Sequence, residues 1–200
     1  MKHIGIYGGT FSPPHVGHIH AARTFLTEGG IDALTVIPTF LTPLKEREEQ
    51  TSATDRLQMC RLAFSFSPRI TVSDMEIRRG GKSYTAETLL ALASPTVRLS
   101  FLCGTDMLLS MDTWHEPETI FRLAQIVCMR RESDAENTER LLKKAEEYRR
   151  HFGACVRFLE APPVHVSSSE VRERLARGED CSALLCQEVL SYIRKRGLYQ

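Results

Sequence analysis

The sequence predicts an α/β fold with a doubly wound, mainly parallel sheet and helices on both faces. The first observation behind this prediction is that short apolar segments rich in β-branched residues alternate with longer, helix-sized segments. Such alternation produces right-handed strand–helix–strand crossovers, which make consecutive strands parallel. The second is the opening of the chain, where an apolar strand ends in a pair of glycines and a helix follows after a short turn.

The individual elements follow from the same patterns. We expect strands near residues 2–7, 33–37, 70–74, 97–103, 124–129 and 155–160. We expect helices near residues 17–28, 53–65, 85–93, 117–123, 134–150, 168–177 and 183–195. Together they form a Rossmann-like sheet, in which ligands bind beyond the carboxyl ends of the strands. Residues 1–200 are predicted to be one domain with a C-terminal helical segment from about residue 167, since this length supplies one full core.

The composition excludes several classes of protein. The 42% hydrophobic and 26% charged residues are ordinary for a globular domain, and the net charge of +1 gives no reason to expect nucleic acid or membrane partners. No apolar run approaches the roughly 20 residues of a membrane span. The six cysteines include no Cys-x-x-Cys pair and are predicted to be buried, reduced thiols of a cytoplasmic protein. A homo-oligomer is left open.

The segment between the first strand and the first helix is the most informative. Gly8 and Gly9 have no side chain, so a ligand can approach the main chain closely. His15 and His18 are three residues apart at a helix start, which puts them on one face where unpaired N–H groups attract anions. This arrangement predicts a nucleotide phosphate site. A metal site that includes His20 is the alternative, although His18 and His20 point to different helix faces.

A second candidate phosphate site lies near the other end of the chain. Ser167 and Glu170 have the spacing of a capping box, which explains these two residues without any ligand. That explanation leaves out Ser168 and Ser169, which share the same turn. Capping also gives no reason for Arg172, whose positive charge is disfavoured by the helix dipole near an amino terminus. A bound phosphate would resolve this conflict by pairing with the guanidinium.

These two segments resemble the signatures of a known family. The run from Gly8 to His18 resembles the first signature of the HxGH nucleotidylyltransferases, particularly the bacterial nicotinate-nucleotide adenylyltransferases, and the run from Val166 to Arg172 resembles the second. The resemblance extends over nearly the whole chain. It implies transfer of the adenylyl group of ATP to nicotinate mononucleotide, which gives nicotinate adenine dinucleotide and pyrophosphate in NAD biosynthesis. It also implies Mg²⁺, held by phosphate and water and by no protein side chain.

The resemblance assigns roles to individual residues. The catalytic residues that it implies are His15, His18, Lys45 and Arg172. The ATP-binding residues are Gly8, Gly9, Thr10, Phe11, Gly17, Gly104, Asp106, Ser167, Ser168 and Ser169. The residues that bind the nicotinate nucleotide are Tyr84, Thr85, Trp114 and Arg130.

The residues alone leave alternatives for several of these roles. Thr85 is also a fitting helix N-cap, and Trp114 also fits a hydrophobic core. The carboxylate of Asp106 is suited either to a ribose or to capping the next helix. Either Arg130 or Arg131 matches the family's arginine.

The chain departs from the family pattern at a few positions. Ser12 stands where the family has Asp, Leu44 stands where it has His beside the lysine, and Ser169 replaces Thr while keeping the hydroxyl.

Three other interpretations compete with the family assignment. They are a phosphopantetheine adenylyltransferase or cytidylyltransferase of the same superfamily, a nucleotide sensor without turnover, and a structural α/β domain.

Overall fold

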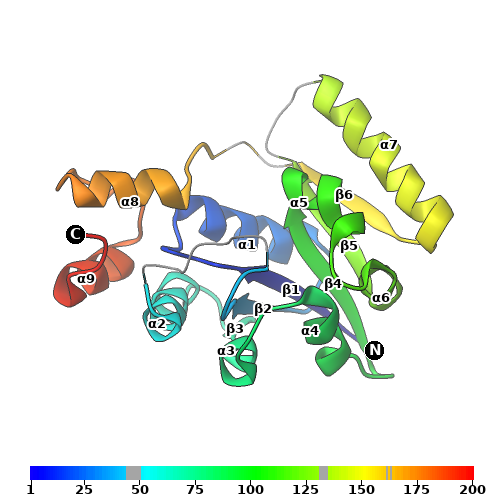
Figure 1. The fold of residues 1–200 in the computed structure, drawn as a ribbon, viewed down its shortest axis with the longest axis horizontal. Helices are drawn as coiled ribbons and strands as arrows, with labels where there is room; N and C mark the ends of the chain where they lie inside the picture. Colours follow the sequence, from blue (N-terminus) through cyan, green and yellow to red (C-terminus); the bar gives the residue numbers. More distant parts are fainter. Residues whose placement is uncertain (44–50, 131–134, 161, 163) are drawn as a thin grey trace. The chain divides into compact units, whose positions relative to one another are not determined.

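The computed structural model describes residues 1–43, 51–130, 135–160, 162 and 164–200 (Figure 1). Lys45 and Leu44 lie outside the described residues, as does Arg131. The described strands are β1 (Lys2–Gly9), β2 (Ala33–Pro38), β3 (Ile70–Val72), β4 (Val97–Gly104), β5 (Ala124–Arg130) and β6 (Val156–Glu160). The described helices are α1 (Val16–Glu28), α2 (Ala53–Ala63), α3 (Met75–Arg79), α4 (Thr85–Leu92), α5 (Thr105–Ser110), η1 (Met111–Thr113), α6 (Pro117–Leu123), α7 (Ala135–Phe152), α8 (Ser168–Ala176) and α9 (Gln187–Arg196).

The strands form one sheet in the order β3-β2-β1-β4-β5-β6. The pairs β1–β4, β4–β5 and β5–β6 are parallel, and Ile6 lies opposite Phe101 in the first of them. The order of the strands reverses between β1 and β4, which is the defining feature of a doubly wound sheet. The predicted parallel α/β fold is therefore confirmed.

The structure corrects a few of the predicted elements. Helices α3 and α5 and the 3-10 turn η1 were not predicted, because each is six residues or shorter and too brief to show a helical period. The last helix begins at Gln187 rather than near residue 183. The residues before it form a separate turn, in which the Leu184 and Leu185 N–H groups both donate to the Cys181 carbonyl.

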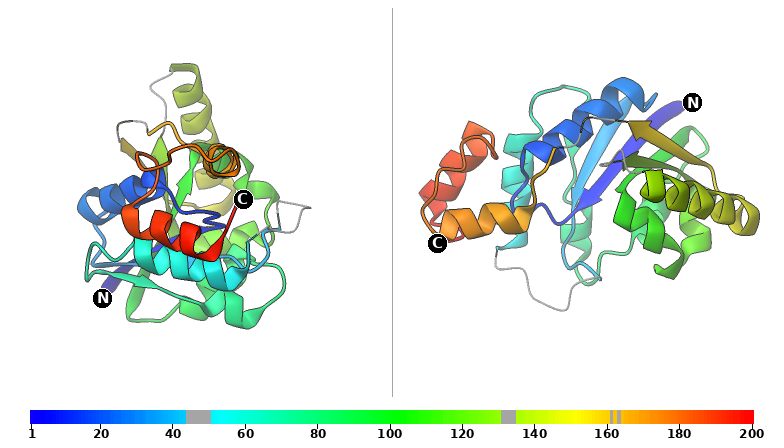
Figure 2. Two further views of the ribbon diagram at one scale, coloured as in Figure 1. Left: turned by 90° about the vertical axis from the view of Figure 1, so that its left-hand side faces the viewer. Right: turned by 90° about the horizontal axis from the view of Figure 1, so that it is seen from above.

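The chain divides into two compact units, which we call the first and second units. The first unit is Met1–Tyr7, Thr24–Leu34 and Tyr84–Pro163, and the second is Gly8–Arg23, Thr35–Ser83 and Val164–Gln200. In the second unit, α9 lies alongside α2 (Figure 2). The single domain expected over residues 1–200 stays a prediction.

The core of the first unit is formed by its central strands and an aromatic cluster. Strand β4 is buried continuously from Leu99 to Cys103, as expected for a strand covered on both faces. The ring of Phe121 packs 4.6 Å from that of Tyr148 and 4.9 Å from that of Phe152. No helix among the described residues is long and apolar enough to span a membrane.

The cysteines differ partly from the prediction. All six are free thiols, and four of them are buried. Cys155 is exposed and Cys186 is half-buried, so the expected burial is wrong for these two. Burial raises the pKa of the Cys60 thiol, which keeps that group protonated.

Candidate functional site

The two histidines of the first motif form a stack at the start of α1. Their ring centroids are 3.7 Å apart with an interplanar angle of 29°. His15 is 3% exposed and lies just before the helix, where its carbonyl accepts the N–H groups of His18 and Ile19. The i, i+3 spacing thus puts both imidazoles on one face, as predicted.

A main-chain contact selects the proton position on His18. The N–H of His15 donates to Nδ1 of His18 at 3.1 Å. Because Nδ1 accepts this bond, the neutral ring must hold its proton on Nε2. The proton of His18 therefore lies on Nε2, the ring nitrogen that does not accept the His15 N–H.

Gly17 has a packing role beneath this stack. A Cβ at position 17 would lie 3.0 Å from Cγ1 of Val166 and 3.1 Å from the His15 ring. The Val166 side chain and the His15 ring would then have to give way by a few tenths of an ångström, so a side chain at position 17 would disturb His15. Gly9 is constrained in the same way, because its Cβ would lie 3.0 Å from the Phe11 ring.

Phe11 lies underneath the loop rather than at its surface. It is buried, has a left-handed φ of 50°, and packs edge-on against His18 at 5.0 Å and Phe64 at 5.6 Å. Its side chain therefore supports the histidine stack from below. This burial leaves only the main chain of Phe11 for contact with a nucleotide, and its ATP-binding role stays a prediction.

The second motif is hydrogen-bonded directly to the first. Nη1 of Arg172 donates to the Ser12 carbonyl at 2.7 Å, and Nη2 donates to Oγ of Ser169 at 3.0 Å. Oγ of Ser168 donates to the Pro13 carbonyl at 3.0 Å. A guanidinium has five N–H donors, and these bonds engage two of them. The cation near the start of α8 is thus oriented by the loop that precedes α1.

Ser167 caps α8 as predicted. Its hydroxyl accepts the Glu170 N–H at 3.1 Å. Glu170 itself forms an ion pair with Arg174 at 2.9 Å, one turn further along the helix. The capping explanation therefore accounts for Ser167, and the Ser168 and Ser169 hydroxyls are instead bonded to the Pro13 carbonyl and to Arg172.

Sequence reasoning missed Arg56, which holds the loop from the other side. This α2 residue is 1% exposed, and its guanidinium donates to the Thr10 carbonyl at 2.9 Å and to the Phe40 carbonyl at 3.0 Å. The sequence offers one indication, namely an Asp-Arg pair in the first turn of a helix. Asp55 is also buried, and hydrogen bonds from Ser52, Tyr192 and Arg196 lower its pKa against the effect of burial.

The predicted acceptor residues lie in the first unit. Helix α4 begins at Thr85, and Tyr84 occupies the N-cap position without a side-chain capping bond, so the interpretation of Thr85 as the cap is wrong. The ring of Tyr84 lies 4.3 Å from that of His115. His115 was not predicted, although it directly follows Trp114. Glu116, which comes next, adopts a left-handed φ of 50° that turns the chain into α6.

Trp114 is half-buried after the turn η1. Its ring meets that of Phe101 edge-on at 6.3 Å, and its Nε1 donates to Oγ of Ser110 at 3.4 Å. One ring edge is thus packed in the core while part of the ring stays accessible. The hydrophobic-core alternative is therefore met in part, and the role of Trp114 in binding the nicotinate nucleotide stays a prediction.

A buried polar network supports this turn. The Tyr148 hydroxyl donates to the Leu108 carbonyl at 2.8 Å and accepts the Asp112 N–H at 3.2 Å. Nζ of Lys144 donates to Asp112 at 2.7 Å. Burial opposes ionisation of Asp112, but the hydrogen bond and positive charge of Lys144 lower the pKa of this carboxyl. Helix α7 thereby fixes the turn that presents Trp114.

Two further predicted residues lie at the start of α5. Gly104 is its N-cap and has no side-chain capping bond, and the exposed Asp106 lies in its first turn. Arg130, at the end of β5, is paired with Glu160 and donates to Thr138 at 3.3 Å. Its positive charge is therefore already balanced by a carboxylate in this structure.

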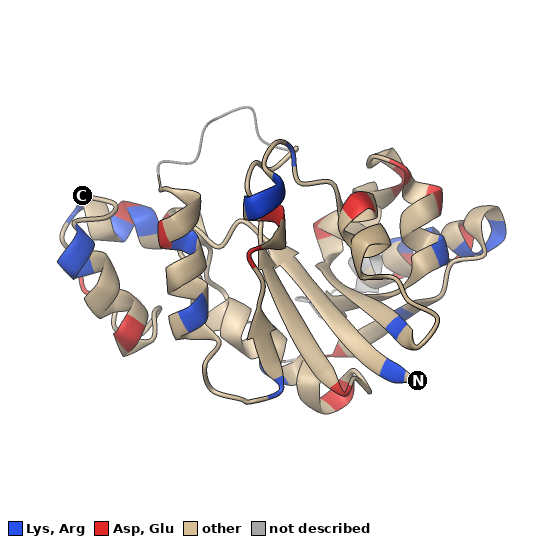
Figure 3. Cartoon of the chain, turned by 90° about the horizontal axis from the view of Figure 1, so that it is seen from below, with Lys and Arg blue, Asp and Glu red and all other residues tan. Residues whose placement is uncertain are grey.

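The described residues contain no cluster of three His, Cys, Asp or Glu side chains that could hold a metal ion. His15, His18 and His20 thus do not form the alternative metal site. Residues of both charge signs are interspersed along the chain in the cartoon (Figure 3).

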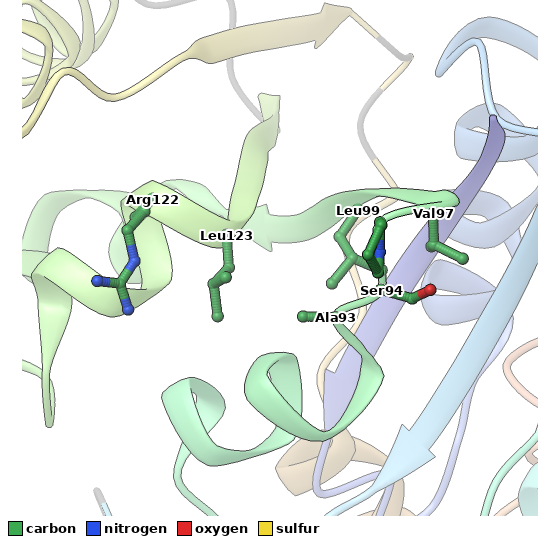
Figure 4. A pocket seen from close by; sticks show the side chains of 7 residues that line it. Ala93, Ser94, Val97, Leu99, Arg122 and Leu123 are labelled. Atoms are coloured by element: carbon green, nitrogen blue, oxygen red, sulfur yellow. The ribbon is translucent and has the colours of Figure 1, made fainter.

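A hollow of about 320 Å³ lies elsewhere in the first unit (Figure 4). It is lined by Ala93, Ser94, Pro95, Val97, Leu99, Arg122 and Leu123. Val97 begins β4, so this hollow is at the amino end of the strand, opposite the carboxyl end where doubly wound sheets bind ligands. None of the predicted site residues that the structure describes lines it.

Comparisons with known proteins agree with the motifs. The model of the cytidylyltransferase-like family matches residues 6–174. A Neisseria meningitidis protein named "Probable nicotinate-nucleotide adenylyltransferase" is 38% identical over 207 residues, with 100% of both chains covered. A protein of the same name from Desulfatibacillum aliphaticivorans is 33% identical, with 98% of this chain and 99% of that protein covered.

A solved structure shows the same fold. It is the nicotinic acid mononucleotide adenylyltransferase of Plasmodium falciparum complexed with NaAD, which superposes with a TM-score of 0.77 at 22% identity and covers 100% of this chain and 98% of its own. The family model and the full-length relatives lead to one conclusion. This chain belongs to the nicotinate-nucleotide adenylyltransferases of the cytidylyltransferase-like family.

Proposed function

We propose that this protein transfers the adenylyl group of ATP to nicotinate mononucleotide and releases nicotinate adenine dinucleotide and pyrophosphate. The observation that supports this most strongly is the joined pair of motifs in the second unit. The histidine stack at the start of α1 and the Arg172 guanidinium of α8 are connected by hydrogen bonds through one loop. Such an array of N–H and O–H donors is suited to a chain of phosphates.

The reaction needs orientation more than acid–base chemistry. A phosphate oxygen of the acceptor nucleotide, already anionic at neutral pH, forms a bond to the α-phosphorus of ATP. The bond from that phosphorus to the pyrophosphate oxygen breaks, and no proton has to move. Catalysis then depends on positioning and on stabilising charge at the α-phosphate. His18 supplies an Nε2–H donor there, and the stacked His15 holds that ring in place.

The leaving pyrophosphate is assigned to the second motif. Arg172 keeps N–H donors beyond its two bonds to the protein, and the Ser168 and Ser169 hydroxyls lie in the first turn of α8. The N–H groups of this turn add a positive dipole. Lys45 is proposed to join them from the segment after β2.

The donor set fits Mg²⁺ only as an ion held by phosphate. The described residues near the loop are imidazoles, hydroxyls and guanidinium groups, and they provide no carboxylate cluster. Mg²⁺ commonly binds through substrate phosphates and water. When bound, the ion would neutralise part of the charge of the triphosphate.

The nicotinate nucleotide is assigned to the first unit. Trp114 offers a partly accessible ring for stacking on the pyridine, and the N–H groups at the start of α4 suit its carboxylate. Tyr84 and Thr85 lie at that helix start. Asp106 is proposed as a ribose partner, and Arg130 as a contact to the acceptor.

The six free thiols favour a reducing compartment, which leads us to propose a cytoplasmic location.

The test is pyrophosphate release with ATP and Mg²⁺ and one acceptor at a time. The acceptors are nicotinate mononucleotide, nicotinamide mononucleotide and phosphopantetheine. Release with the nicotinate form alone supports the proposal and sets its specificity. Release with phosphopantetheine instead would move the protein to another branch of the superfamily. ATP binding without release with any acceptor would indicate a nucleotide sensor.

A further inference from the structure

The Ser12 side chain has a partner from the far end of the chain. Ser12 is 2% exposed, and its carbonyl accepts a hydrogen bond from Arg172. Its hydroxyl is hydrogen-bonded to the Tyr199 hydroxyl at 3.1 Å. Main chain and side chain of this one residue are therefore held by two different segments, both in the second unit.

The path of the chain after α9 brings Tyr199 to this position. Gly197 caps α9 with a left-handed φ of 62°, and the Leu198 N–H returns to the Ile193 carbonyl at 3.1 Å. Tyr199 itself has a φ of 63°, which a residue with a Cβ rarely adopts. Contacts with the rest of the unit are needed to maintain such a conformation.

Helix α9 is itself fixed to α2. The Tyr192 hydroxyl donates to Oδ1 of Asp55 at 2.8 Å, and Nε of Arg196 reaches the same oxygen at 3.2 Å. Asp55 is next to Arg56, whose guanidinium holds the Thr10 carbonyl. The segment that ends in Tyr199 and the loop that contains Ser12 are thus connected to the same short part of α2.

Tyr199 keeps a neutral phenol hydroxyl, which can donate or accept in its hydrogen bond with Ser12. Burial raises the pKa of its hydroxyl, although hydrogen bonds with Ser12 and Thr51 oppose the shift. The phenol therefore remains protonated at neutral pH. Neither the first motif nor the second contains this residue, and no local pattern in the sequence connects it to Ser12.

We propose that Tyr199 is a positioning residue of the phosphate site, which holds the Ser12 loop in the geometry that presents His18 and Arg172 to the triphosphate. The inference rests on the proposed function, because it assigns the loop to ATP. It adds a residue 187 positions away from Ser12 to the machinery. Its action is indirect, since its hydroxyl touches the loop and not the reacting atoms.

The test compares Tyr199→Phe with Tyr192→Phe, a matched loss of a phenol hydroxyl from α9 itself. For Tyr199→Phe we expect kcat/KM for ATP to fall roughly 3- to 10-fold, the range that one neutral hydrogen bond allows. The KM for nicotinate mononucleotide stays close to the wild-type value, and the thermal midpoint falls because a buried hydroxyl loses its hydrogen bond. For Tyr192→Phe we expect a lower thermal midpoint with kcat/KM within about twofold of wild type. A purely structural role for Tyr199 would produce the Tyr192→Phe pattern in both variants and would overturn the proposal.

A double-mutant cycle examines the contact itself. Ser12→Ala and Tyr199→Phe each remove one side of the hydrogen bond, so the double variant should be no worse than the more damaging single variant. Additive losses would show that the two residues act independently, contrary to the proposal.

Binding of inorganic tripolyphosphate, measured by calorimetry on the same variants, separates this inference from the proposed function. We expect Tyr199→Phe to weaken this binding and Tyr192→Phe to leave it unchanged. Wild-type protein that binds tripolyphosphate but releases no pyrophosphate would contradict the proposed function and leave the role of Tyr199 supported. Wild-type protein that does not bind it, or unchanged binding in Tyr199→Phe, would contradict the role of Tyr199.

Discussion

The two units position their candidate groups by different forces. In the second unit, main-chain carbonyls of the loop after β1 accept hydrogen bonds from Arg56, Arg172 and Ser168. In the first unit, the rings of Trp114 and Tyr84 pack against those of Phe101 and His115, and hydrogen bonds act on the turn before Trp114 and on its Nε1. Hydrogen bonds fix direction as well as distance, whereas ring packing allows sliding at little cost.

This difference matches the different requirements of the phosphate groups and of the pyridine ring of the substrates. Charge that develops at phosphorus is stabilised only by donors in a fixed geometry. A flat pyridine ring gains from contact area and tolerates small shifts. We therefore expect changes in the second unit to lower the rate, and changes in the first unit to weaken binding of the acceptor. The following predictions test this division.

The largest effect is expected for His18→Ala. Removing the Nε2–H donor should lower kcat by roughly 10²- to 10³-fold, the usual cost of losing one donor to a developing charge. Steady-state pyrophosphate release measures it. His151→Ala removes an exposed histidine at the end of α7 and serves as the control. A His18→Ala variant that turned over at nearly the normal rate would remove the histidine from the mechanism.

Arg172→Lys should have the next largest effect. The charge remains, but an ammonium cannot make the two directed bonds to the Ser12 carbonyl and the Ser169 hydroxyl. We expect kcat/KM for ATP to fall about 10- to 100-fold, the range for hydrogen bonds of a charged group. Arg174→Lys, on the same helix and paired only at the surface with Glu170, should stay within about twofold. Equal effects of the two substitutions would mean that charge alone matters.

Trp114→Ala should produce a smaller and different effect. Losing the ring should raise the KM for nicotinate mononucleotide roughly 3- to 10-fold, as expected for one stacking contact, while the KM for ATP stays close to wild type. Trp114→Phe should recover part of the loss. Initial rates with each substrate varied separately distinguish the two constants. A change in the KM for ATP of similar size would break the proposed division between the units.

The smallest effect concerns acid stability of the second unit. Hydrogen bonds from Ser52, Tyr192 and Arg196 lower the pKa of Asp55 in the folded state. The ionised carboxylate thus stabilises the fold above its unfolded pKa of about 4, and this contribution is lost as the pH falls through the folded value. Thermal midpoints of wild type and Asp55→Asn should differ at pH 7 and converge in acid. A constant difference over this range would show that Asp55 acts without its charge.

Local patterns predicted most of the fold, for a physical reason. Strand β4 is apolar except for Arg98 and Ser100, and Ser167 caps α8, so both elements are specified by neighbouring residues. The His15–His18 stack was predictable because helix geometry alone brings positions i and i+3 together. Short elements such as α3 were missed because five residues contain little more than one helical period.

The supports of the site could not be predicted in this way. Arg56 reaches Thr10 across 46 positions and Tyr199 reaches Ser12 across 187. Such contacts depend on the packing of α2 and α9, which no local spacing encodes. The same holds for Tyr148, which supports the turn before Trp114 from α7. Lys45 lies outside the described residues, and its role stays a prediction.

The Arg56 guanidinium has a mechanical consequence. One planar, rigid group donates to both the Thr10 and Phe40 carbonyls. It therefore holds the loops that follow β1 and β2 at a fixed separation. Phe40 leads along the chain toward Lys45. A force that displaces one loop is therefore transmitted to the other. We therefore expect the two loops to move together, and not independently, when either of them is displaced.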